Sequence, residues 1–161
     1  MAPGAEGLHA RDFAFEADFA SNLRCIPMAV RRKLDLAGVK LKLNHWLALP
    51  GPERQTLVEW HDDPGAIADL RRHLLARTAA LADGPARPLS PANGEPWQQG
   101  MGVPEAVLAA CEPLDLKVDD ADWAGLDELQ RFVLVKLSQP GHEHRNLAAA
   151  VAEFLTEAER S

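Results

Sequence analysis

The sequence predicts an all-α fold, a compact helical domain with an internal duplication. Apolar residues recur every three or four positions in several segments, which is the spacing of amphipathic helices. The sequence also matches itself without gaps at an offset of 77 residues, the separation of Trp46 and Trp123. Its composition, 47% hydrophobic and 25% charged residues, is that of a globular protein.

The chain begins with a polar segment, residues 1–12, that lacks the basic start and apolar stretch of a secretory signal. We expect this segment to be a flexible tail and residues 13–161 to form a single helical domain. No apolar run approaches the length of a membrane span, and the two cysteines lack CxxC spacing. We therefore expect a soluble, cytoplasmic protein that does not bind membranes.

The repeat divides the domain into copies at about residues 26–82 and 103–158. Each copy is expected to hold a helix opened by proline, a short extended stretch, a turn carrying tryptophan, and a second helix. The aligned pairs are Pro27 with Pro104, Val30 with Val107, Lys40 with Lys117, Trp46 with Trp123, Leu49 with Leu126, Arg54 with Arg131, Leu57 with Leu134 and Val58 with Val135.

The first helix is expected to run from Pro27 to Gly38. Proline fits the first helical position, where its missing N–H costs nothing, and glycine fits a left-handed C-terminal cap. The apolar residues on its inner face are Ile26, Val30, Leu34 and Ala37.

An alternating pattern follows this helix in each copy, and it is typical of short strands or of extended connectors. If these segments are strands, we expect them to pair between the copies. The alternating apolar residues are Val39, Leu41 and Leu43 in the first copy and Leu114, Leu116 and Val118 in the second.

The tryptophan turn comes next, and both Trp46 and Trp123 are expected in the core because a buried aromatic side chain removes about 150–250 Å² from water. Asp119 is the expected N-cap in the second copy. The matching residue in the first copy, Lys42, cannot cap, so Asn44 is expected to start that turn.

The apolar run in Arg131–Leu137 is compatible with a helix or a buried strand, but its partner, residues 52–60, has a composition that favours helix. Both are therefore predicted to be helical. A longer amphipathic helix follows each copy. The first is capped by Asp63 and carries Ile67, Leu70, Leu74, Thr78 and Leu81, and the second carries Leu147, Val151, Phe154, Leu155 and Ala158. Residues 83–102, with four prolines and four glycines, are expected to be a linker.

Two dense blocks of the sequence resemble the nitrate reductase-associated protein family over residues 13–156. The first block contains Phe15-Glu16-Ala17-Asp18-Phe19, Leu23-Arg24-Cys25-Ile26-Pro27-Met28-Ala29-Val30, Lys33-Leu34-Asp35 and Gly38-Val39-Lys40-Leu41. The downstream block contains Trp46, Glu53-Arg54, Leu57-Val58, Arg131-Phe132, Lys136-Leu137-Ser138, Pro140-Gly141-His142-Glu143 and Asn146.

The resemblance implies a setting and no activity. Its implied partners are nitrate reductase or proteins of the molybdenum-cofactor pathway, and it carries over no catalytic residue and no cofactor. The motif residues that we single out as candidates are Cys25, Pro27, His142, Glu143 and Asn146.

None of the chemical motifs is strong. The two histidines of His142-Glu143-His144 would point apart on a helix, so no metal is expected there. The acidic residues around Asp120 fail the calcium-loop template because its twelfth position is Arg131. A thiol at Cys25 has a nucleophilic interpretation, but its apolar neighbours favour a buried, inert side chain.

Charge is unevenly distributed along the chain, although the net charge of −7 argues against nucleic-acid binding. Residues 1–82 carry 11 basic and 10 acidic side chains, while residues 83–161 carry 6 and 14. The basic residues of the first copy have two interpretations, an ordinary solvated face or a docking patch for an anionic partner. They are Arg24, Arg31, Arg32, Lys33, Lys40 and Lys42.

Three functional hypotheses follow. The first is a non-enzymatic accessory protein of nitrate assimilation, which the resemblance and the lack of a catalytic constellation favour. The second is a binder of nitrate or a molybdopterin-type anion at the basic patch around Arg31 and Lys33. The third is an enzyme or metal protein that uses Cys25, His142 and Glu143.

Overall fold

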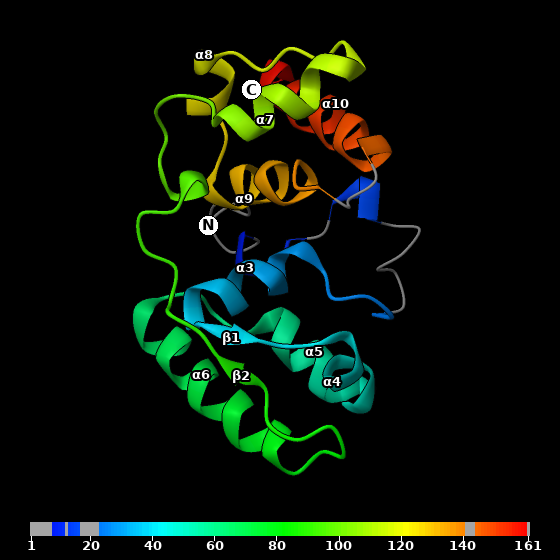
Figure 1. The fold of residues 1–161 in the computed structure, drawn as a ribbon, viewed down its shortest axis with the longest axis vertical. Helices are drawn as coiled ribbons and strands as arrows, with labels where there is room; N and C mark the ends of the chain where they lie inside the picture. Colours follow the sequence, from blue (N-terminus) through cyan, green and yellow to red (C-terminus); the bar gives the residue numbers. More distant parts are fainter. Residues whose placement is uncertain (1–7, 12, 17–22, 141–143, 161) are drawn as a thin grey trace. The chain divides into compact units, whose positions relative to one another are not determined.

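The computed structural model describes residues 8–11, 13–16, 23–140 and 144–160, and most of them are helical, as the sequence predicts (Figure 1). The α-helices are α3 (Met28–Ala37), α4 (Leu43–Ala48), α5 (Gly51–Glu59), α6 (Pro64–Ala79), α7 (Glu105–Cys111), α8 (Asp120–Ala124), α9 (Glu128–Leu137) and α10 (His144–Arg160). Short 3₁₀ helices are η1 (Leu8–Ala10), η2 (Ala14–Glu16), η3 (Pro96–Gln98) and η4 (Glu112–Leu114). The strands are β1 (Val39–Lys40) and β2 (Arg87–Pro88).

The chain divides into two compact units. Of the described residues, 8–11, 16 and 23–93 make up the first, and 13–15, 94–140 and 144–160 make up the second. The two predicted repeat copies therefore fall into different units. The single domain expected over residues 13–161 stays a prediction. Of the expected flexible tail, residues 1–7 and 12 lie outside the described residues, while Leu8–Ala10 form η1.

Helix α3 begins and ends close to its predicted limits. Pro27 is the N-cap rather than the first helical residue, and the buried carboxylate of Glu16 accepts the Met28 N–H at 2.8 Å. At the other end Gly38 has a φ of 73°, which is the left-handed cap expected of glycine. Its N–H donates to the carbonyls of Leu34 and Asp35, which satisfies carbonyls of the last helical turn.

The extended segment of the first unit is a strand, but its partner was not predicted. Val39 and Lys40 of β1 pair antiparallel with Pro88 and Arg87 of β2, which lies in the expected linker. The second expected segment contains no strand, because Leu114 lies in η4 and Asp115 takes a left-handed φ of 56°. The prediction of strands that pair between the copies is therefore wrong.

Helix α4 begins one residue earlier than predicted. Lys42 is the N-cap residue, and its N–H donates to Nδ1 of His45 at 3.1 Å. The predicted start of the helix at Asn44 is therefore wrong, and His45 makes the capping hydrogen bond. The other ring nitrogen of His45 lies 3.0 Å from the Gly84 carbonyl and must donate to it. His45 thus joins the start of α4 to the segment after α6.

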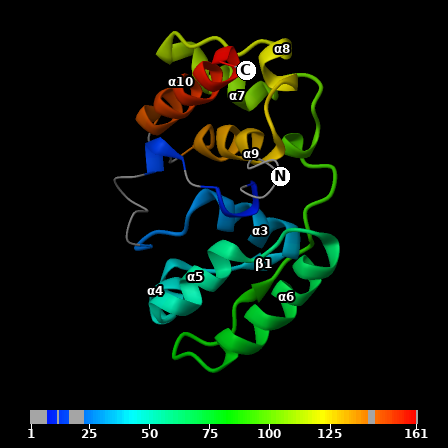
Figure 2. The same ribbon diagram turned by 180° about the vertical axis from the view of Figure 1, so that it is seen from behind.

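Helix α6 has the predicted cap and the predicted buried face. The Asp63 carboxylate accepts the Ala66 N–H at 3.1 Å, and Pro64 opens the helix. The side chains of α6 that face the core are Ile67, Leu70, Leu74 and Thr78. Leu81, the last residue of the predicted stripe, lies beyond the end of α6 and is half-buried. Figure 2 shows α6 of this unit alongside β1, with which it is in contact.

The second unit is built from α7 to α10, and α9 contacts η3, α7 and α10. Asp119 caps α8 as predicted, by accepting the Asp122 N–H at 2.7 Å, and Asp127 caps α9 in the same way. The ambiguous apolar run lies in α9, so its prediction as helix is confirmed. On α10 the predicted residues Leu147, Val151 and Phe154 are buried, together with Ala150. Leu155 of the predicted stripe is only half-buried.

A buried indole lies in the core of each unit. Trp46 and Trp123 are both 0% exposed, as predicted. Trp46 Nε1 donates to the Leu23 carbonyl at 2.7 Å, and Trp123 Nε1 donates to the Gln99 carbonyl at 2.9 Å. Each indole therefore binds the segment that precedes the first helix of its own unit.

The repeated arginines also make matching contacts. Arg54 donates to the Leu49 carbonyl at 2.9 Å, and Arg131 donates to the Leu126 carbonyl at 2.5 Å. Both pairs are related by the same offset of 77 residues as the tryptophans. These equivalent bonds support the proposal that the two units arose by duplication.

We predict that Trp123→Ala lowers the free energy of unfolding by about 3–5 kcal/mol, the usual cost of truncating a buried aromatic side chain. The substitution leaves a cavity and removes the donor to Gln99. Urea denaturation followed by circular dichroism measures this loss. Trp60→Ala is the comparison, because Trp60 is only half-buried and should cost less. A fully stable Trp123→Ala variant would contradict the structure of this core.

Candidate functional site

The predicted basic patch is only partly on the surface. Arg24, Arg31 and Lys40 are exposed, but Arg32 is 6% exposed and Lys33 is 0% exposed. The prediction of a surface position is therefore wrong for Arg32 and Lys33. For Lys33 the reason is helical spacing, since it follows Val30 by three positions and precedes Ala37 by four, which places it on the buried face of α3.

Lys33 caps the end of a neighbouring helix. Its Nζ donates to the carbonyls of Leu57 at 2.7 Å, Val58 at 2.7 Å and Trp60 at 2.8 Å. The last carbonyls of a helix have no partner within the helix, and an ammonium group has three hydrogens to donate. The charge also lies at the negative end of the α5 dipole. Lys33 therefore connects α3 to the end of α5.

An ion pair lies beside this ammonium group. Arg32 Nη1 donates to Asp62 Oδ2 at 2.9 Å. Burial lowers the pKa of Lys33 to about 7, with the Asp62 charge opposing this change and the Arg32 charge adding to it. Burial alone would raise the pKa of Asp62, but the hydrogen bond from Arg32 and its charge outweigh burial and lower that pKa. Asp62 thus remains ionised and paired.

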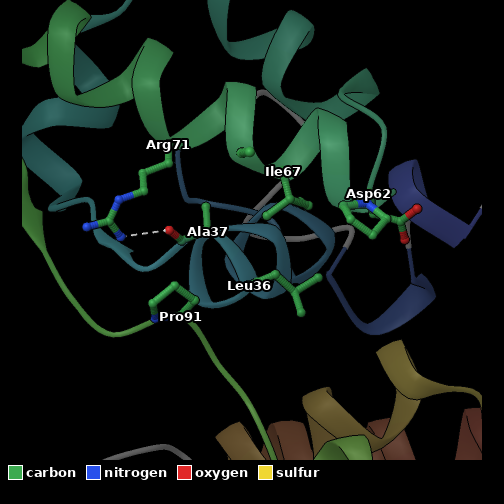
Figure 3. A pocket seen from close by; sticks show the side chains of 8 residues that line it. Leu36, Ala37, Asp62, Ile67, Arg71 and Pro91 are labelled. Carbon is green, nitrogen blue, oxygen red and sulfur yellow. Dashed lines mark hydrogen bonds between the residues drawn. The ribbon is translucent and has the colours of Figure 1, made fainter.

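An open groove of about 390 Å³ lies next to this network in the first unit (Figure 3). Its walls come from the end of α3, the start and middle of α6 and the segment after β2. Most of the lining is apolar, with Arg71 toward one end and Asp62 toward the other. The lining residues are Leu36, Ala37, Asp62, Pro64, Ile67, Ala68, Arg71 and Pro91.

Backbone oxygens fix the guanidinium of Arg71. Its Nη1 donates to the carbonyls of Ala37 at 3.0 Å, Gly38 at 2.9 Å and Leu89 at 3.0 Å. Gly38 must be glycine here, because a Cβ would lie 2.4 Å from the Leu89 oxygen and 2.7 Å from Arg71 Nη1. The α3 cap, the segment after β2 and the Arg71 end of the groove are therefore one connected structure.

A second surface of the first unit combines cations with exposed leucines. We call it the α4 surface, and it consists of Lys40, Lys42, Leu43 and Leu47. Leu43 is 47% exposed and Leu47 is 46% exposed, and both lysines are exposed. The two leucines are four positions apart on α4, so they share one face of the helix.

Of the remaining sequence candidates, Cys25 and Pro27 lie in the first unit and Asn146 lies in the second. Cys25 is half-buried rather than buried, Pro27 is the N-cap of α3, and Asn146 is half-buried on α10. His142 and Glu143 lie outside the described residues. Burial raises the pKa of the Cys111 thiol, which makes it less reactive at neutral pH.

Metal binding and membrane insertion were both considered for the residue ranges that the structure describes. Within them, no group of three or more histidine, cysteine, aspartate or glutamate side chains is placed to hold a metal ion. No helix of those ranges has both the length and the apolar character needed to cross a membrane.

The groove was not predicted from the sequence because its walls come from three separate segments. Arg71 looks like an ordinary charged residue of an amphipathic helix, and Pro91 looks like part of a linker. No local pattern indicates that they meet at Gly38. The burial of Lys33, in contrast, could have been found from its spacing to Val30 and Ala37.

Comparison with family models matches residues 12–154 to the conserved nitrate reductase-associated protein family. A comparison with curated proteins finds no match, and a comparison with solved structures finds none. The family match covers both units and includes the groove and the α4 surface.

We predict that Lys33→Ala costs about 2–5 kcal/mol of unfolding free energy at pH 8, because it opens a cavity and leaves the Val58 and Trp60 carbonyls without a donor. Lys40→Ala is the matched control, since Lys40 is exposed. Urea denaturation of both variants and of the wild type measures the difference.

The stability difference between wild type and Lys33→Ala should also depend on pH. The pKa of Lys33 is about 7 in the folded protein and about 10.4 in an unfolded chain. Between these values the unfolded chain binds more protons at Lys33, so the contribution of this residue to stability rises with pH. It is complete above the unfolded value, is lost as the pH falls from about 10.4 to about 7, and does not change further below pH 7. A difference that stayed constant from pH 6 to pH 10 would contradict this account.

Proposed function

This chain belongs to the conserved nitrate reductase-associated protein family, and we propose that it is a non-enzymatic accessory protein of nitrate assimilation in the cytoplasm. It acts by binding nitrate reductase or a protein of the molybdenum-cofactor pathway. The family match, which extends over residues 12–154, is the observation that carries this proposal. The structure adds a surface suited to protein contact.

The α4 surface is the best candidate for that contact. Two exposed leucines on one helix face with cations beside them give an apolar centre and a polar rim, which is the arrangement of protein interfaces. The residues of α8 at the offset of 77 from Leu43 and Leu47 are Asp120 and Ala124. The equivalent short helix of the second unit therefore forms without leucines at these positions, so the core does not require them.

The charges of the α4 surface specify the partner chemistry. Lys40 and Lys42 precede the leucines. Arg24 is not part of the α4 surface, but it follows Leu23, whose carbonyl accepts a hydrogen bond from Trp46 of α4. All three cations are exposed. Their field attracts an acidic surface with an apolar centre and raises the rate of encounter with it. We propose such a surface on the partner protein.

The second hypothesis, binding of nitrate or a molybdopterin-type anion at the basic patch, has less support. Lys33 donates all three of its hydrogens to backbone carbonyls, and Arg32 is paired with Asp62. The patch is therefore reduced to separate exposed cations, and we do not propose it as the principal function.

We predict that Leu43→Glu combined with Leu47→Glu abolishes capture of nitrate reductase in a pull-down at physiological salt from nitrate-grown cells. The change introduces two negative charges where an acidic partner would dock, so repulsion adds to the loss of apolar contact. Quantitative mass spectrometry of the captured proteins measures the effect.

Leu108→Glu is the matched control because Leu108 is 48% exposed and lies on α7 of the second unit. It should capture as much nitrate reductase as the wild type, and neither variant should lose thermal stability. If the wild-type protein recovers neither nitrate reductase nor a cofactor-pathway protein, the proposed function is wrong. If the α4 variant captures normally, the partner binds elsewhere.

A further inference from the structure

The charges at the two ends of the groove differ in their pairing. Asp62 forms an ion pair with the buried Arg32, so this end is electrically balanced. Arg71 donates only to neutral backbone carbonyls through Nη1, and within the described part of the chain it forms no ion pair. Its Nε and Nη2 hydrogens donate to no protein atom of that part. The groove therefore presents one uncompensated positive charge.

The walls between these ends are apolar. Leu36, Ile67 and Pro91 lie between Arg71 and Asp62 in Figure 3, and Ala68 contributes a small side chain to the lining. The volume of about 390 Å³ falls in the range of small-molecule sites, which are mostly apolar with a few fixed polar groups. Because Arg71 is anchored on three carbonyls, its guanidinium is already fixed before a ligand arrives.

We propose that this groove binds a small organic monoanion with an apolar body, of the class of medium-chain carboxylates. The apolar body lies along Leu36, Ile67 and Pro91, and the carboxylate lies at the Arg71 end. A guanidinium donates readily to a planar carboxylate. The proposal does not depend on the accessory function, which concerns the α4 surface.

The same features disfavour other ligand classes. A phosphate or other dianion would meet only one unpaired cation, and the oxygens of Ala37, Gly38 and Leu89 surround that cation on one side. Nitrate has the right charge but no apolar body to bury against the walls. An alkylammonium ion would be repelled at the Arg71 end, and at the other end Asp62 is already paired with Arg32.

Isothermal titration calorimetry with a carboxylate series tests the proposal. We expect butanoate, hexanoate and octanoate to bind with increasing affinity, by up to about fourfold for each methylene that the groove buries. Octylamine and sodium nitrate should bind at least tenfold more weakly than octanoate. Equal binding of octylamine and octanoate, or no heat from octanoate, would overturn the proposal.

Two alanines of α6 provide matched variants. Ala68 lines the groove and is exposed, so Ala68→Phe should fill the groove without disturbing the core and weaken octanoate binding at least tenfold. Ala76 is exposed on the same helix and does not line the groove, so Ala76→Phe should bind octanoate like the wild type. Unchanged binding by Ala68→Phe would overturn the assignment to this groove.

Arg71→Gln should weaken octanoate binding at least tenfold and leave the weak binding of octanol unchanged. Arg72→Gln is its control, because Arg72 is the next residue and pairs with Asp69 on the surface. Arg71 also stabilises the Gly38 junction, so circular dichroism must show that the variant is folded, and Ala68→Phe tests the site if it is not. If octanoate fails to bind while Ala68→Phe abolishes capture of nitrate reductase, the groove holds a protein side chain and the small-molecule proposal is wrong.

Discussion

The first unit depends on one buried amino group. The Lys33 side chain is 0% exposed, and its Nζ donates to the carbonyls of Leu57, Val58 and Trp60 at the end of α5. A buried amino group is costly unless hydrogen bonds satisfy it, and a helix end is costly unless a donor covers it. Each group thus compensates for the other. This bond joins α3 to α5 and fixes the point where the chain turns toward α6.

The groove forms on this framework. Arg32, the neighbour of Lys33 on α3, pairs with Asp62 just before α6. Arg71 of α6 donates to the carbonyls of Ala37 and Gly38 at the end of α3. Helices α3 and α6 are thus connected near both ends of the groove, which keeps its apolar walls apart. The cations of the predicted basic patch therefore have different roles in the structure. Arg32 and Lys33 of that patch support the structure, while Lys40 and Lys42 are exposed and remain available to a partner. Arg71, which lies outside the patch, supports the groove.

Local signals predicted the helices well. The caps at Gly38, Asp63 and Asp119 and the buried tryptophans follow from residue type and spacing over a few positions. Contacts between distant segments could not be predicted in this way. The partner of β1 lies in a segment rich in proline and glycine, and the walls of the groove meet only because Arg71 and Leu89 converge on Gly38. The family, in turn, indicates a biological setting but does not identify the residues that act in it.

The state of the Lys33 ammonium can be observed directly by nuclear magnetic resonance of its side-chain nitrogen, assigned by comparison with Lys33→Arg. We predict a resonance below pH 7 from a group with three hydrogens that exchange with water far more slowly than those of Lys40. We also predict titration near pH 7, where burial sets the pKa of Lys33. Rapid exchange, together with a pKa close to the ordinary value of about 10.4, would show that Lys33 is solvated and does not connect α3 to α5.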